Sequence, residues 1–358
     1  MGIKNLNKFL RDKCPQVFEP IHLSMYAYKK VAIDISLYLC KFKAVCGDRW
    51  ITAFVNLIIS LRRNEIHCVF IFDGKAPPEK DLERAKRRDE KEKLEMNINK
   101  LDDALNEYHK TGEVADALTQ LWVKRKTSLE LPKRLLTPDK DETDKIDMVW
   151  ITDKIKQKRN QIIDISTSDI LLVKHLFDIM NVPYYTASGE AEKLCAKLCI
   201  NGLVYAVLSE DTDLIAYKTP RFLTKIDTTD DTCVVLEYDK ILESMKMTPE
   251  QMLDFCIMCG TDYNDNVFKV GNQTAYKHLQ THGSIDEIAK NTSLDITILK
   301  HIKGREMFTQ WDPDNITQIP YCGLPDFPVL KTFVMENQIN VNFESLKDAF
   351  ESKIIIEE

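Results

Sequence analysis

The sequence predicts an α/β fold in which a mostly parallel sheet is covered by helices on both faces. Short β-branched and aromatic runs alternate with helical patterns along the chain, and this alternation is typical of parallel sheets. Acidic residues recur at the ends of these runs, which is where ligands bind in such sheets. With 358 residues, 44% of them hydrophobic, the chain can fill one large core or two domains.

The elements follow in chain order. We expect strands at 31–35, 68–72, 183–185 and 204–208, where Val, Ile, Phe and Tyr are concentrated. We expect helices at 51–63, 168–180 and 191–200, where apolar residues recur with a helical period.

A different composition separates the second strand from the third. Between Lys80 and Arg159 the chain becomes charged and helical with few apolar positions, and Pro132 and Pro138 interrupt it. Residues 74–160 carry 21 Lys and Arg against 19 Asp and Glu, so this segment is slightly basic in an otherwise acidic chain. It is predicted to be an insertion; the simpler alternative is a solvated hairpin or a partly disordered linker.

Composition also indicates which classes of protein and of metal site are disfavoured. The apolar run within 51–61 is too short to span a membrane and charged residues interrupt the start of the chain, so we expect a soluble intracellular protein. Its ten cysteines are expected to be reduced and mostly buried. Cys256 and Cys259 form a C-x-x-C, but their apolar helical context disfavours zinc. The net charge of −7 does not exclude DNA, because local patches decide.

Seven acidic residues stand at the expected strand ends and turns. Any one alone would be read as a surface acid, a cap or a turn residue. Together they would raise one another's pKa values, so their convergence makes sense only around cations. Oxygen ligands select Mg²⁺ or Mn²⁺ over zinc, and two such ions support displacement at phosphorus. The candidate metal ligands are Asp34, Asp73, Glu190, Glu192, Asp211, Asp213 and Asp262.

The order and spacing of these motifs resemble the flap endonuclease and XPG family of structure-specific 5′ nucleases. The matching segments are M-G-I-K-N-L at 1–6, A-I-D at 32–34, F-D-G-K at 72–75, G-E-A-E at 189–192, S-E-D-T-D at 209–213 and G-T-D-Y at 260–263. The resemblance covers residues 1–95 and 165–285. It implies a PIN-like nuclease core, an inserted helical arch and a helix-two-turn-helix that binds DNA. It also implies that Asp34, Asp73, Glu190 and Glu192 serve mainly one of two Mg²⁺ ions, with Glu192 as a candidate for sharing, and that Asp211, Asp213 and Asp262 serve the other.

Further positions follow from the resemblance. Lys80 and Arg87 match a Lys and an Arg that point at the scissile phosphate; seven residues of spacing would keep both on one helix face. Gly2 matches a residue that tucks against the active site. In the helix-two-turn-helix, family members bind K⁺ through backbone carbonyls between two glycines, but Lys269 replaces the first of them here. Either K⁺ or the Lys269 ammonium would then meet the phosphate. The expected DNA contacts are Gly2, Lys269, Gly271 and Lys277.

The expected organisation is therefore an N-terminal nuclease region at 1–95, an inserted arch at 96–164, an internal nuclease region with the helix-two-turn-helix at 165–285, and a helical extension at 286–358. We expect a monomer that acts on branched or gapped DNA with a 5′ single strand, at intracellular sites of replication, repair or recombination; no sliding-clamp motif is present. Two alternatives stay open: a non-catalytic DNA-junction scaffold and a metal-dependent ribonuclease.

Overall fold

The computed structural model describes residues 2–129 and 146–351. The chain divides into two compact units. The first comprises Met1–Phe42, Asp48–Glu83 and Ile165–Glu358, and the second comprises Lys43–Gly47 and Arg84–Asp164. All seven strands belong to the first unit.

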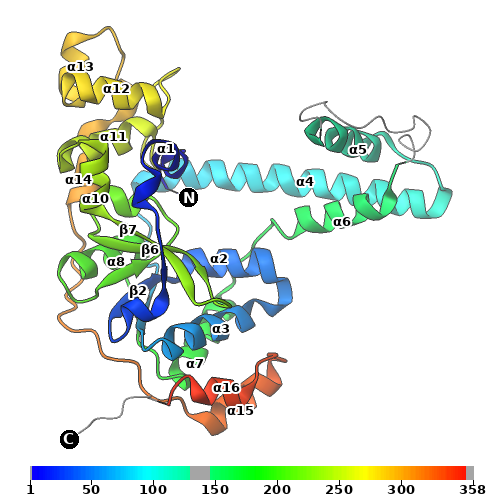
Figure 1. Ribbon diagram of the computed structural model, residues 1–358. Helices are drawn as coiled ribbons and strands as arrows, with labels where there is room; N and C mark the ends of the chain where they lie inside the picture. The colour runs from blue at the N-terminus through cyan, green and yellow to red at the C-terminus, as the bar shows by residue number, and fades with distance from the viewer. Residues whose placement is uncertain (1, 130–145, 352–358) are drawn as a thin grey trace, which may run out of the picture. The chain divides into compact units, whose positions relative to one another are not determined.

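The first unit is built on one seven-stranded sheet with the order β1-β7-β6-β5-β2-β3-β4 (Figure 1). The five strands from β6 to β4 are mutually parallel, whereas β7 runs antiparallel to both β6 and β1. The predicted mostly parallel sheet is therefore confirmed. The strands are Glu19–His22 (β1), Lys30–Asp34 (β2), His67–Phe72 (β3), Tyr184–Thr186 (β4), Ala206–Leu208 (β5), Arg221–Asp227 (β6) and Thr232–Glu237 (β7).

Two buried cores cover the two faces of the sheet, because successive residues of a strand point to opposite faces. On β2 and β3, Ala32 and Val69 belong to one core, and Ile33 and Phe70 belong to the other. The first core also draws on α1, α8, α10, α11 and α12; the second draws on α2, α3, α7, α15 and α16 (Figure 1). Helices thus cover both faces, as predicted.

Helices surround the sheet in this unit; the end of α2 and the start of η3, at Lys43–Gly47, belong to the second unit. The α-helices are Leu6–Lys13 (α1), Ile35–Cys46 (α2), Trp50–Arg63 (α3), Thr167–Ile179 (α7), Ala191–Ile200 (α8), Asp213–Ala216 (α9), Tyr238–Met245 (α10), Pro249–Cys259 (α11), Asn272–His282 (α12), Ile285–Asn291 (α13), His301–Thr309 (α14), Phe327–Glu336 (α15) and Phe343–Asp348 (α16). Short 3-10 turns lie at Pro15–Val17 (η1), Leu23–Tyr26 (η2), Gly47–Arg49 (η3), Pro78–Lys80 (η4) and Thr297–Leu299 (η5).

The stretch Ile35–Arg63 corrects one expectation, since by length and composition alone it is apolar enough to cross a membrane. It is divided into α2 and α3 by the turn η3, and half of its most apolar window is buried. Phe54 and Ile58 are fully buried in the second core. Burial of this kind is typical of core helices, which we take α2 and α3 to be.

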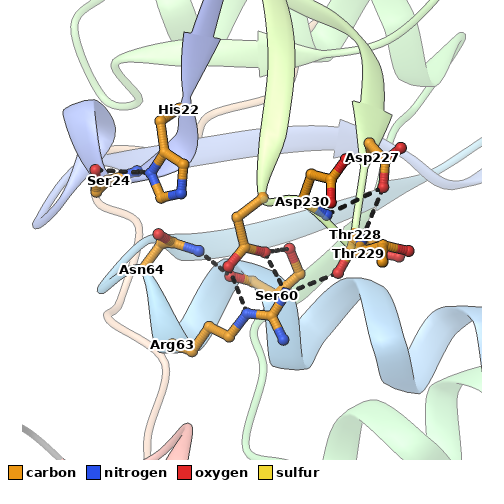
Figure 2. Close-up of polar contacts among 10 residues, drawn as sticks. His22, Ser24, Ser60, Arg63, Asn64, Asp227, Thr228, Thr229 and Asp230 are labelled. Carbon is orange, nitrogen blue, oxygen red and sulfur yellow. Dashed lines mark hydrogen bonds and ion pairs between the residues drawn. The ribbon is translucent and has the colours of Figure 1, made fainter.

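A polar cluster ties the turn between β6 and β7 to α3 (Figure 2). Arg63 donates from Nε and Nη2 to the two carboxylate oxygens of Asp231, each at 2.5 Å, and from Nη2 to the carbonyl oxygen of Thr228 at 2.7 Å. Ser60 Oγ donates to Asp231 Oδ1 at 2.6 Å. The antiparallel side of the sheet is thereby anchored to a core helix.

The second unit has a small core of its own. It contains most of Asp81–Thr111 (α4), together with Asp116–Leu129 (α5) and Met148–Arg159 (α6). Leu101, Leu118 and Ile151 are buried together, and the guanidinium of Arg125 lies 4.6 and 4.8 Å from the ring centres of Trp122 and Trp150. The predicted insertion is helical as expected, while Pro132, Pro138 and most of the acidic run after them lie outside the described residues.

Candidate metal centre

The carboxyl ends of three neighbouring strands bring four acids to one edge of the sheet. Asp34 is the last residue of β2, Asp73 follows β3, and Asp211 and Asp213 follow β5. Because β5, β2 and β3 are adjacent and parallel, their carboxyl ends meet at the same edge. This placement is the one predicted from the sequence.

The turn that carries Glu190 is joined directly to the residues after β3. Asp73 Oδ1 accepts a hydrogen bond from the backbone N–H of Ala191 at 2.8 Å, at the first turn of α8. The N–H of Gly74 donates to the carbonyl oxygen of Gly189 at 2.8 Å. A Cβ on Gly74 would overlap the carbonyl of Ala187, so only glycine allows this approach. The F-D-G-K and G-E-A-E segments, more than 100 residues apart in the sequence, are thereby held side by side.

Three of the acids form a buried cluster. One carboxylate oxygen from each of Glu192, Asp211 and Asp213 lies within 4.8 Å of the others, and all three residues are buried. Among the described residues, neither carboxylate oxygen of Asp213 has a hydrogen-bond partner. An unpartnered buried carboxylate is unfavourable by several kcal/mol in proteins unless a cation binds it. The donor set therefore fits a hard divalent metal ion.

The pKa values support this fit. Burial, reinforced by the charges of Asp73 and Asp211, raises the pKa of Asp34 to about 8. Burial together with Asp211 also raises the pKa values of Glu192 and Asp213. Such groups resist ionisation in the protein alone, and a nearby cation favours their charged forms.

Lys80 joins two further acids, Glu190 and Asp262, to the cluster. Its Nζ lies 2.5 Å from Glu190 Oε1, 3.2 Å from Asp262 Oδ2 and 3.4 Å from Glu192 Oε1. Burial alone would lower the pKa of Lys80, but Glu192 and Glu190 help to outweigh burial and hold the pKa above its usual value. The ammonium therefore stays charged. Tyr263 OH donates to Glu190 Oε2 at 2.5 Å.

The position of Lys80 corrects one detail of the sequence analysis. Lys80 ends the 3-10 turn η4, and α4 begins at Asp81. The regular helical spacing expected between Lys80 and Arg87 does not hold from its first residue. Arg87 is exposed on α4 and belongs to the second unit, so its role stays a prediction.

The N-terminal segment lies against the acids. A Cβ on Gly2, whose φ is 75°, would overlap Oδ1 of Asp211 and lie 2.6 Å from Oδ1 of Asp213. Lys4 holds the segment in place, because its backbone N–H donates to the carbonyl of Gly260 at 3.0 Å, just before Asp262. Gly2 is therefore beside the metal centre.

The other expected DNA contacts lie around the start of α12. Lys269 is exposed with φ 61°, Gly271 is the exposed N-cap residue of α12, and Lys277 is exposed on the same helix. Phe268, which the sequence analysis did not single out, has 82% of its surface exposed. Tyr263 was not predicted as a site residue either, although it directly follows Asp262 in the G-T-D-Y motif.

Comparisons with known proteins agree with this arrangement. Residues 1–94 match the XPG N-terminal domain and residues 181–262 match the XPG I-region. A probable RAD2-like endonuclease of invertebrate iridescent virus 3 is 33% identical over 86% of this chain and 85% of its own length. Flap endonuclease 1 of Zea mays is 32% identical over 98% of this chain and 87% of its own.

Solved structures share the fold. The catalytic core of Rad2 in complex with DNA substrate superimposes with a TM-score of 0.64 at 16% identity, over 98% of this chain and 99% of that one. The flap endonuclease of Methanococcus jannaschii gives a TM-score of 0.58 at 20% identity, over 93% and 94% of the two chains.

Proposed function

The chain belongs to the flap endonuclease and XPG family of structure-specific nucleases, and from this premise we propose that it is a metal-dependent 5′ nuclease. It would hydrolyse phosphodiester bonds in flap, nicked, gapped or recessed-end DNA, leaving a 5′ phosphate and a 3′ hydroxyl. The observation that carries the proposal is the buried cluster of Glu192, Asp211 and Asp213, in which both oxygens of Asp213 lack a partner within residues 2–129 and 146–351.

The metal requirement is part of the proposal. We propose that Asp34, Asp73, Glu190 and Glu192 hold one Mg²⁺ or Mn²⁺, and that Asp211, Asp213 and Asp262 hold the second. When bound, two such ions supply a hydroxide nucleophile at neutral pH and stabilise the departing oxygen.

The chain's own residues perform the positioning. Lys80, charged and 12% exposed at its side chain, can exchange a carboxylate contact for a non-bridging phosphate oxygen and so offset the charge that develops in the transition state. Tyr263 fixes the rotamer of Glu190 through its hydrogen bond. We propose that Arg87 provides a second cationic contact to the same phosphate.

Duplex binding is assigned to the α12 region. Lys269 and Lys277 are exposed cations, and Gly271 as N-cap residue has no side chain to cap the start of α12, where helices favour an anion. K⁺ held by backbone carbonyls beside Lys269 would bind the same phosphates of the duplex. The catalytic core of Rad2 was solved in complex with DNA substrate, which supports DNA as the ligand class.

The two alternatives predict different results. A scaffold that only binds junctions would gain from fewer carboxylates near phosphates, and this chain retains all seven. A ribonuclease would need the same metal chemistry but an RNA strand.

One experiment separates these possibilities. End-labelled flap, nick, gap, bubble and four-way DNA substrates, with RNA copies of the flap and nick, are incubated with Mg²⁺ or with EDTA. We expect cleavage of the DNA substrates that carry a 5′ single strand or end, and none in EDTA. Cleavage of RNA alone, or binding without cleavage of any substrate, would reject the proposal.

A further inference from the structure

The segment between α14 and α15, residues 310–326, contains neither helix nor strand and is called the strap below. It contacts the first unit beside the turn that leads to Glu190 and again at the amino ends of β2 and β3. Lys30 Nζ, on β2, donates to the carbonyl of Ile319 at 2.6 Å, and the N–H of Cys322 donates to His67 Nδ1, on β3, at 3.1 Å. The strap is therefore fixed to the sheet beyond its contacts with the metal centre.

Its first part grips the turn that leads to Glu190. Asp314 Oδ1 accepts a hydrogen bond from the backbone N–H of Ser188 at 3.0 Å. Lys197 Nζ, on α8, donates to the carbonyl oxygens of Asp312 at 2.7 Å and Asp314 at 2.8 Å. The approach is close, because a Cβ on Gly189 would lie 2.5 Å from Asp312 Oδ2. The glycine of the G-E-A-E motif thus makes room for the strap.

The opposite side of the same turn is held by the segment after β3, where Gly74 and Lys75 donate backbone hydrogen bonds to Gly189 and Ser188. Ser188 and Gly189 are therefore clamped between two segments. Glu190 follows directly, so these contacts restrain the backbone from which its side chain extends.

Asp312 has a second effect, on charge. Lys193 directly follows Glu192 and is 8% exposed, and its Nζ pairs with Asp312 Oδ1 at 3.1 Å. A buried ammonium that loses its partner seeks another carboxylate or is strongly unfavourable. With Asp312 in place, the Lys193 charge is satisfied outside the metal centre.

We propose that Asp312 and Asp314 are positioning residues that fix Glu190 and Glu192 in the geometry that binds metal. The inference rests on the proposed metal-dependent function. Groups that hold metal ligands in place typically change metal affinity by about 10- to 100-fold when removed, because a ligand displaced by about 1 Å no longer fits the ion.

The test compares Asp314→Ala, Asp314→Asn, Asp312→Ala and Asp312→Asn with Asn315→Ala, an exposed neighbour on the strap. Mn²⁺ affinity is measured by calorimetry without DNA, cleavage is measured across a Mg²⁺ titration, and exchange of the Ser188 amide hydrogen is followed in metal-free protein. For both alanine variants we expect Mn²⁺ affinity to fall on the order of ten-fold, and the Mg²⁺ concentration for half-maximal cleavage to rise similarly.

The conservative variants distinguish positioning from general damage. Asp314→Asn retains an oxygen that can accept from Ser188, so we expect it to restore both metal affinity and Ser188 protection. Asp312→Asn retains the shape but not the charge that satisfies Lys193, so it is expected to stay defective. If Asp314→Ala fails to fold, Lys197→Met loosens the strap without touching an acid and is expected to weaken Mn²⁺ binding.

Two results would have different meanings. If every variant has the same metal affinity and the same Ser188 exchange as Asn315→Ala, Asp312 and Asp314 are not positioning residues. Failure of the wild type to bind Mn²⁺ or to cleave any substrate would instead reject the proposed function, while Ser188 exchange in Asp314→Ala and Asp314→Asn would still report on the contact itself.

Discussion

Replacing Asp34 by Asn should stabilise the protein in EDTA at pH 8 while abolishing cleavage. Asp34 is buried, and burial with the charges of Asp73 and Asp211 raises its pKa to about 8, from 3.8 for a free side chain. Asn is the same shape as protonated Asp, and its oxygen can keep the hydrogen bond from the Ser36 N–H at 3.0 Å. The substitution removes the charge and keeps the contact.

The magnitude follows from the two pKa values. A pKa raised in the folded state means that stability is full below pH 4 and is lost as pH rises from about 4 to about 8. The difference between the two pKa values corresponds to about 5 to 6 kcal/mol in the free energy of unfolding at pH 8. This figure is an upper limit, because the neighbouring acids share protons with Asp34. We therefore expect Asp34→Asn to be more stable than wild type by a few kcal/mol at pH 8 and equally stable at pH 4.

The assay is urea unfolding in EDTA at several pH values, repeated with Mg²⁺ at pH 8. Mg²⁺ should raise the stability of wild type more than that of Asp34→Asn, because the variant lacks one ligand. Asp12→Asn, at an exposed position on α1, is the control. If Asp34→Asn is no more stable than wild type at pH 8, or if its extra stability is equally large at pH 4, the electrostatic reasoning is refuted.

Three further predictions concern activity. Asp211→Ala and Glu190→Ala should each abolish cleavage but leave DNA binding intact or slightly tighter, as measured by gel cleavage and fluorescence anisotropy; residual cleavage above about 1% would contradict the ligand assignment. Lys80→Ala and Arg87→Ala should each slow single-turnover cleavage on the order of 10²-fold with a smaller change in DNA affinity, and equal losses of both would make them general phosphate contacts. Replacing residues 111–160 by a short Gly/Ser linker should preserve cleavage of nicked duplex but erase discrimination between free and streptavidin-blocked flaps, and discrimination that survives would place the gate elsewhere.

The sequence predicted best those elements whose signal lies in a run of consecutive residues. The central strands β2 and β3 are buried on both faces and therefore read as continuous apolar runs. Strands β1 and β6 were missed because polar residues interrupt their apolar pattern, as Thr224 and Lys225 do in β6. Strand β7 was missed although Cys233 to Leu236 form an apolar run, and its antiparallel pairing is visible only in space.

The candidate site likewise contains residues that a local motif marks and contacts that only the folded chain shows. Six of the seven acids could be found because each ends or follows a strand or lies at the start of a helix, and Asp262 because it stands in the G-T-D-Y motif. The grip of the strap on Ser188 could not be found, because it uses backbone groups and an Asp 126 positions away, and no local pattern marks such a contact. Lys80 was found through a family motif, but its contacts with three carboxylates required the folded chain.

The pairing of β1 with β7 has a consequence for synthesis of the protein. Strand β1 ends at His22, and its partner begins at Thr232, so β1 has no neighbour in the sheet until about 210 residues later in translation. At about 5 to 20 residues per second this interval lasts about 10 to 40 s. Asp262 and the carbonyl of Gly260 that receives Lys4 are made later still. A ribosome-bound chain therefore carries six of the seven acids for about 2 to 10 s before Asp262 is made, and the candidate metal centre is incomplete during that interval.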